Sequence, residues 1–264
     1  MQHLEGGLGQ RSLFVTGLQP PLTMLYEGRR MRTFILSLAA LAAIPTPATA
    51  ATRNFGITSF EKVRVDGPFR VHLTTGVAPF ASASGTSAAI DQVTIEMRGD
   101  TLVIRKSMDS WGGFSGSSNS PVEISLGTHD LSTVWLNGSG AIAIDKVKGL
   151  SFELSVQGSG AAAIDQTDVD QLKVAIAGTG SVTLGGRVGK MTAIVRGVST
   201  LDASQLQVKD ASIGAEGTAT IAAAVSNSAT VDGTGAVTVR LTGAPACTLR
   251  VGGSASVSGC KSTQ

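Results

Sequence analysis

The C-terminal half of the chain alternates apolar and polar residues around regularly spaced glycines. The residues two and four positions before each glycine, and four and six positions after it, are mostly Val, Leu, Ile or Ala. The positions between them are mostly Ser, Thr, Gln, Lys, Glu or Ala. An alternation of period two on both sides of a Gly-x-Gly turn predicts a strand, a turn and a second strand. The turn glycines are assigned as Gly138, Gly158, Gly178, Gly197, Gly217, Gly233 and Gly253.

The spacing of these glycines predicts a repeat fold, because the first three lie 20 residues apart. A strand–turn–strand unit of this size cannot bury its apolar face alone, so neighbouring units must stack and pair at roughly 4.8 Å per turn. We therefore expect an all-β fold, a right-handed parallel β-helix (β-solenoid) with rungs of about 20 residues. The alternative is an antiparallel sandwich or barrel of short strands, which does not require equal spacing over so many units.

Residues 54–127 also read as short strands, but without a regular repeat. Alternating residues at 93–97 and 102–104 flank Gly99-Asp100, and this arrangement predicts a hairpin. An open end of a solenoid exposes unpaired backbone groups. We therefore expect this part to form the first, atypical rungs and to cap the stack.

The segment 31–50 has the organisation of a secretory signal peptide. Met31-Arg32 precedes an apolar run over 34–44, and the small residues Ala48-Thr49-Ala50 follow it. The run is too short for a membrane-spanning helix, which needs about 20 residues. We expect translation to start at Met31 and residues 1–30 to be a mis-assigned extension, although a genuinely long N-terminal region is the alternative. The mature chain then begins near Ala51, forms a single domain over 51–264 and resides in the periplasm, the outer envelope or outside the cell.

The net positive charge of the chain comes from its N-terminal segment. The full sequence has 21 basic and 19 acidic residues, and the first 50 residues hold four Arg and two Glu. Seventeen of each sign therefore remain after cleavage, and the mature net charge is zero. A nucleic-acid-binding protein would need a basic face, so the sequence does not favour that class.

Two aspartates are the strongest candidates for chemistry. Asp145 and Asp165 each lie seven residues after a turn glycine, so stacking would place them about one rung apart. Such a pair could bind calcium or raise one carboxyl pKa, as a catalytic pair does. The alternative is two solvated loop aspartates. Together with Glu153 they form the only acidic cluster that could serve a polysaccharide lyase or hydrolase.

The segment from Lys106 to Ser120 is rich in Gly and Ser and reads as a loop. Its two aromatic residues, Trp111 and Phe114, could form an exposed platform for a sugar or a protein partner. The alternative is that both rings fold back onto the solenoid wall.

The two cysteines, Cys247 and Cys260, lie in the last repeat and the tail. An even count in an exported protein favours a disulfide, which would hold the final coil against fraying. The alternative is that Cys247 is simply a small inward-facing residue.

Other polar residues fit structural roles along the stack. Glu153 lies one repeat before Lys173, and Arg196 one repeat before Glu216, so ion pairs between rungs are expected. Asn137 and Gln157 could form a short amide ladder. The Gly-x-Gly turns lack the third glycine of a dinucleotide-binding motif. His72 and His129 occupy unrelated repeat positions, which favours surface or packing roles over metal binding, and we expect no cofactor.

Three features together resemble one known family. They are the segment VRVDGPFRVHLTTG at 63–76, the segment GDTLVIR at 99–105 and the repeated GSG and GTG turns. Over about residues 54–243 the chain is similar to the putative auto-transporter adhesin, head GIN domain family, although it lacks a Gly-Ile-Asn triplet. The resemblance implies an exported bacterial envelope protein, a right-handed β-helix like that of pectin lyases, no conserved catalytic residues and a role in adhesion.

Three functions are compatible with these observations. The leading hypothesis is a non-enzymatic envelope module that binds a glycan or an envelope or surface protein. The second is a polysaccharide lyase or hydrolase on the same scaffold. The third is a structural module that forms homo-oligomers through a flat solenoid face.

Overall fold

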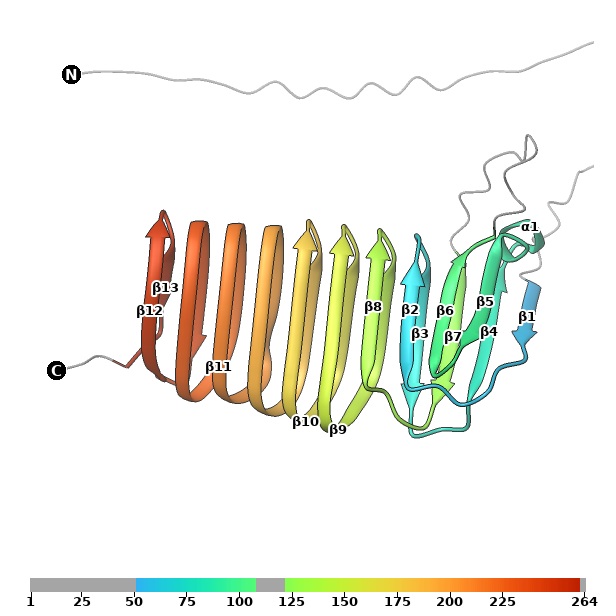
Figure 1. The fold of residues 1–264 in the computed structure, drawn as a ribbon, viewed down its shortest axis with the longest axis horizontal. Helices are drawn as coiled ribbons and strands as arrows, with labels where there is room; N and C mark the ends of the chain where they lie inside the picture. The colour runs from blue at the N-terminus through green and yellow to red at the C-terminus, as the bar shows by residue number, and fades with distance from the viewer. Residues whose placement is uncertain (1–50, 108–121, 262–264) are drawn as a thin grey trace, which may run out of the picture. The chain divides into compact units, whose positions relative to one another are not determined.

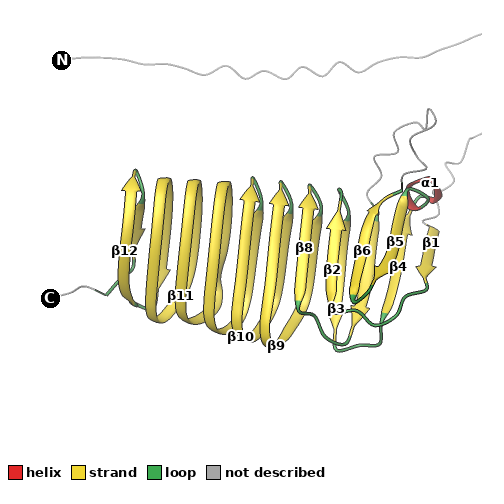
Figure 2. Ribbon diagram, viewed as in Figure 1, coloured by secondary structure: helices red, strands yellow, loops and turns green. Residues whose placement is uncertain are grey.

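The computed structural model describes residues 51–107 and 122–261, and nearly all of them are β-strand (Figure 2). One short helix, α1 (Ser87–Ile90), occurs within these ranges. The prediction of an all-β solenoid is confirmed. The strands are β1 (Ala51–Phe55), β2 (Lys62–Asp66), β3 (Arg70–Thr75), β4 (Phe80–Gly85), β5 (Val93–Arg98), β6 (Thr101–Lys106), β7 (Glu123–Thr128), β8 (Thr133–Gly138), β9 (Ala141–Gly158), β10 (Ala161–Gly178), β11 (Ser181–Thr242), β12 (Ala246–Gly253) and β13 (Ser256–Ser258).

The turns of the solenoid stack side by side and in register (Figure 1). Each turn contributes one strand segment to each of two walls. The first half of β9 pairs with β3, for example, whereas its second half pairs with β8. Val156 and Ile176 are register partners, and both are buried. The aliphatic columns predicted from the alternation therefore form the core between the walls.

The corners at Gly158 and Gly178 are restricted to glycine by their neighbours in the stack. Gly158 has a φ of 108°, and Gly178 has a φ of 120°. A methyl group added at Gly178 would lie 2.5 Å from the carbonyl oxygen of Gly158, and one at Gly158 would lie 2.7 Å from that of Gly138. Both the dihedral angle and the close backbone approach therefore exclude a side chain.

The sixth corner differs from the predicted one. Gly235, with a φ of 100°, pairs with Gly253, whereas Gly233 pairs with Val251 inside the strand. The two turns that meet at Gly235 therefore each span 18 residues. A shift of two residues keeps every side chain on the same face of the strand, because the side-chain period is two. For this reason the alternation alone could not distinguish Gly233 from Gly235.

One turn is shorter by one residue and contains an irregularity in its register. The pairing of β10 with β11 shifts between Ile164 and Thr167, so that Thr167 lies opposite Gly186. Gly186 has a φ of 113° there. Thr167 is buried, and its Oγ1 has no hydrogen-bond partner within the described part of the chain. The missing residue is thus accommodated beside a buried, unsatisfied hydroxyl group.

The N-terminal end is built by a chain that leaves the stack and returns. β2 lies between β6 and β8, and β3 lies between β7 and β9 (Figure 1). The turn formed by β2 and β3 is therefore not the outermost one, because β6 and β5 lie beyond β2, and β7, β4 and β1 lie beyond β3. Antiparallel pairs β1–β4, β4–β7 and β5–β6 cover the end, and β5–β6 is the predicted hairpin. This end is thus the expected cap, but its layers do not follow sequence order.

The C-terminal turn consists of β12 and β13. Cys247 and Cys260 form a disulfide in this turn. Leu249 and Val251 continue the inward columns, but they are 44% and 47% exposed because β12 pairs on one side only, with β11. The disulfide therefore connects the strand that has the least cover to the end of the described chain.

Candidate binding site on the outer wall

A tryptophan lies on the outer face of the wall that contains β2, β6 and β8, which we call the first wall; the wall that contains β3 and β7 is the second wall. Val134 and Leu136 are fully buried, so Trp135 between them points outward, and it is partly exposed. Its register partners are Arg64 on β2 and Ser155 on β9. Ser155 is only 9% exposed although it also points outward. We infer that the indole ring leans along the wall and covers its neighbour.

An ion pair and an amide lie next to this ring. Arg64 donates through Nε to both carboxylate oxygens of Asp66, at 3.0 and 2.9 Å. Asn137 donates through Nδ2 to Asp66 Oδ1 at 2.6 Å. Gln157 is the register partner of Asn137, as the predicted amide ladder requires. However, the amide of Asn137 bonds to Asp66 on the preceding layer.

Two further arginines share one carboxylate. Arg98 donates to Glu96 Oε1 through Nη2 at 2.6 Å and through Nε at 3.0 Å. Arg105 donates to the same oxygen through Nε at 3.2 Å. The guanidinium of Arg105 and then that of Arg98 hold the pKa of Glu96 below its usual range. Glu96 therefore stays ionised, and with Asp66 it gives two negative charges against three positive ones.

These side chains line a shallow depression of about 810 Å³. This volume is within the range of small-molecule sites, about 300–1,000 Å³. Val103 lies at its floor and is buried, although it is flanked by two inward residues and points outward. We call this site the Trp135 patch, and its members are Trp135, Arg64, Asp66, Arg98, Arg105, Asn137 and Gln157.

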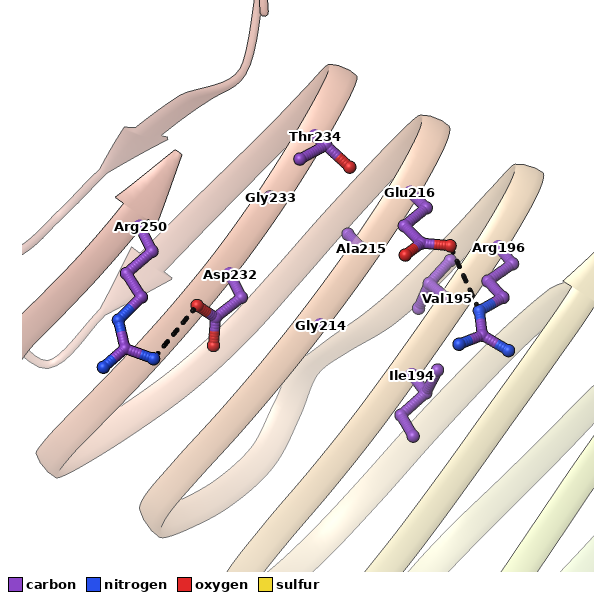
Figure 3. Close-up of a pocket in the computed structure, with 10 residues that line it drawn as sticks. All are labelled: Ile194, Val195, Arg196, Gly214, Ala215, Glu216, Asp232, Gly233, Thr234 and Arg250. Carbon is purple, nitrogen blue, oxygen red and sulfur yellow. Dashed lines mark ion pairs between the residues drawn. The ribbon is translucent and has the colours of Figure 1, made fainter. Parts of the chain in front are cut away.

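A second hollow of about 420 Å³ lies further along the same wall (Figure 3). Ile194 occupies the same outward row as Trp135 and is 45% exposed. Arg196 pairs with Glu216 at 3.2 Å, as the sequence predicts, and Arg250 pairs with Asp232 at 3.9 Å (Figure 3). These four charges balance, and no aromatic ring lines the hollow. It offers fewer recognition groups than the Trp135 patch.

The predicted acidic cluster is divided between the two walls. Asp145 and Asp165 lie on adjacent turns of the second wall, between register pairs Ile144–Ile164 and Lys146–Gln166. Asp145 Oδ1 accepts hydrogen bonds from the backbone N–H groups of Thr75 at 3.0 Å and Lys146 at 2.6 Å. Glu153 lies on the first wall, in the half of β9 that pairs with β8.

The three acids therefore do not meet in one cleft. Residues 51–107 and 122–261 contain no group of three His, Cys, Asp or Glu side chains arranged to hold a metal ion. Glu153 and Lys173 are register partners, but the ion pairs of the described residues do not include them. Trp111 and Phe114 lie outside the described residues.

Sequence reasoning did not identify Trp135 as a site residue. It is the only aromatic residue at an outward position of the repeats, since Phe152 points into the core. This exception to the small and polar outer positions is the signal that could have revealed it. The arginines could not be found in this way, because β2, β5 and β6 come close to β8 only through the return of the chain to the stack.

Several solved structures have a similar fold. A putative adhesin from Bacteroides fragilis NCTC 9343 superposes with a TM-score of 0.66 at 17% identity, over 79% of this chain and 96% of that one. A putative lipid binding protein from Parabacteroides distasonis ATCC 8503 gives a TM-score of 0.63 at 18% identity, over 80% and 96%. A putative adhesin from Parabacteroides merdae ATCC 43184 gives 0.58 at 16% identity, over 80% and 96%. At this level of identity, the likeness shows a shared fold.

The search of curated proteins found no match. A family model does match, and it covers residues 59–245. This range includes β2 to β11 and every residue that lines the Trp135 patch. The chain belongs to the putative auto-transporter adhesin, head GIN domain family.

Proposed function

We propose that this protein is an exported, non-enzymatic adhesion module of the bacterial envelope, and that it binds its partner through the outer face of the first wall. The Trp135 patch carries this proposal. Tryptophan and arginine are the residues most enriched at binding hot spots, and here they gather on an exposed, otherwise small and polar surface. The family description supports the general role of adhesion.

Export through a cleaved segment at 31–50 is part of the proposal. β1 starts at Ala51 and pairs with β4, so cleavage after Ala50 would leave every described strand intact. None of the helices in the described residues has the length and apolar character needed to cross a membrane. Expression of the full chain, followed by N-terminal sequencing of the exported protein, tests this part. The expected N-terminus is near Ala51, and an uncleaved product retained in the cytoplasm would contradict it.

Binding without turnover is the second part. The two candidate aspartates are separated from Glu153 by the core, and Asp145 already accepts two backbone hydrogen bonds. A glycosidase needs two carboxyl groups placed across one bond, and a lyase needs a base beside a charge-stabilising group. This separation therefore favours a binding protein over the polysaccharide-active enzyme.

An attachment assay tests the adhesive role. Cells that carry the chain on their surface are compared with cells that lack it, on immobilised polysaccharides and on cultured cell layers. The proposal predicts attachment above the level of the control cells and no new reducing ends or unsaturated products from the polysaccharides. Equal attachment of the two cell types, or steady release of such products, would contradict it.

A further inference from the structure

We propose that the Trp135 patch is a saccharide-binding site selective for sugars that carry a carboxylate, such as uronates and sialates. This inference deepens the proposed function by naming a ligand class for the same wall. It depends on three properties of the patch: a single accessible indole ring, an excess of positive charge and guanidinium nitrogens left available for a ligand.

The ring provides a surface for a sugar ring. The apolar face of a pyranose packs against an indole through its axial C–H groups, and tryptophan keeps a polar N–H at its edge. Trp135 is partly exposed, and its neighbours along the row are Arg64 and Ser155 rather than other large apolar residues. A protein partner would need a wider apolar centre, because its interface covers about 800 Å² on each side. One ring framed by polar groups suits a sugar better.

The amides and the charge specify what the sugar carries. Gln157 is exposed, and Asn137 is partly exposed, so each can offer an amide group to a hydroxyl. Three arginines face two carboxylates, Asp66 and Glu96, so one positive charge is not neutralised within this network. A carboxylate on the ligand would balance it. The nearby Lys62 does not add to the excess, because it pairs with Asp100 at 2.8 Å.

The arginines differ in how much of each guanidinium is available. Arg98 bonds to Glu96 through both Nε and Nη2. Arg64 and Arg105 bond to their carboxylates through Nε, and the hydrogen bonds of the described residues show no use of their terminal nitrogens. Paired terminal N–H groups can bind a carboxylate in a bidentate manner. Arg64 and Arg105 are therefore the expected carboxylate-binding residues, whereas Arg98 holds Glu96 in place.

The test uses the full chain and an array of uronate- and sialate-containing oligosaccharides, each printed beside its neutral counterpart, with the uronate methyl ester as one such counterpart. The tightest acidic binder and its counterpart are then measured by calorimetry. We expect the acidic form to bind at least about tenfold more tightly than the neutral form, because it gains a charge-assisted hydrogen-bond pair.

Four variants localise the binding. Trp135→Ala should weaken both forms by at least about tenfold, while Trp135→Phe retains part of the affinity. Arg105→Met should remove the preference for the acidic form. Arg98→Met changes the net charge equally and is the matched control, from which a smaller loss is expected. Ile194→Ala, at an exposed position of the same row, should bind as the wild type does.

Several results would overturn this inference. One is a wild-type chain that binds no acidic saccharide on the array. Others are Trp135→Ala binding that equals wild type, equal losses for Arg98→Met and Arg105→Met, or a patch that captures a protein while ignoring the sugars. A wild-type chain that supports attachment but binds no acidic saccharide would reject the inference and leave the adhesive role standing. Sugar binding by a chain that supports no attachment would contradict the adhesive role and leave the inference standing.

Discussion

An alanine substitution at Gly235 and one at Gly233 should have opposite effects on stability. At Gly235, a methyl group would lie 2.5 Å from the carbonyl oxygen of Gly217, and the φ of 100° is unfavourable for any side chain. Backbone strain of this kind costs about 1–3 kcal/mol, and the clash with a rigid backbone carbonyl adds to it. We expect Gly235→Ala to lower the free energy of unfolding by about 3–5 kcal/mol, which is at the upper end for single substitutions.

At Gly233 the same methyl group would meet only ordinary contacts. Its nearest neighbours would be Ala255 Cβ and Val251 Cγ1 at 3.6 Å and Val237 Cγ1 at 3.8 Å. The φ of Gly233 lies outside the left-handed region, so alanine can adopt its backbone conformation. A compatible Gly→Ala change stabilises by about 0.4–1 kcal/mol through the unfolded state. We therefore expect Gly233→Ala to be slightly more stable than wild type.

Urea unfolding followed by circular dichroism measures both variants under identical conditions. The comparison within one pair removes differences in protein batch and in the unfolded baseline. If Gly233→Ala were strongly destabilised and Gly235→Ala were tolerated, the corner of this turn would be at Gly233 and the register of the last two turns would be wrong. Equally small effects would show that neither glycine forms a tight corner.

Three further predictions concern other parts of the chain. Thr167→Val should raise the free energy of unfolding by about 1 kcal/mol in urea titrations, because it replaces a buried hydroxyl that has no partner among the described residues with an isosteric methyl. A loss of stability would show that this hydroxyl is satisfied. Replacing both Cys247 and Cys260 by serine should stabilise the unfolded state by about 3 kcal/mol in the chain-entropy model for a separation of 13 residues. Faster hydrogen exchange should then appear first in β12 and β13, and unchanged exchange there would count against the role of the bond. Finally, Arg105→Met should raise the pKa of Glu96 more than Arg98→Met does, because the side chain of Arg98 is 63% exposed and that of Arg105 only 30%. Since the folded-state pKa of Glu96 is lowered, the stabilisation from this carboxylate is present above the unfolded-state pKa and is lost as the pH falls through the folded-state pKa. Carbon-detected NMR titration of Glu96 measures the pKa shift in each variant. A larger shift in Arg98→Met than in Arg105→Met would contradict this prediction.

The repeated part of the fold could be predicted because one pattern determines it. Alternation of period two assigns every residue to the core or the outer face, and equal spacing aligns the columns, as at Val156 and Ile176. The same parity hides a shift of two residues, which is why the corner at Gly235 was placed at Gly233. The positive φ of Gly235 and its close approach to Gly217 distinguish the two positions.

The N-terminal layers and the Trp135 patch could not be predicted for a different reason. β2 and β3 are inserted between layers formed by later parts of the chain, and no local pattern records the order in which non-adjacent strands pair. Arg64 and Trp135 become neighbours although 71 positions separate them. The outward position of Trp135 was readable from the alternation, but its partners were not.

Contact between a ligand and the Trp135 ring is the most direct test of the functional account. The chain has two tryptophans, Trp111 and Trp135, so its ¹⁵N-labelled form gives two indole N–H signals, which Trp135→Phe assigns. During titration with the acidic saccharide that binds most tightly, we expect the Trp135 signal to move progressively to saturation. A Trp135 signal that stays in place while the saccharide binds, with or without movement of the Trp111 signal, would show that recognition occurs elsewhere.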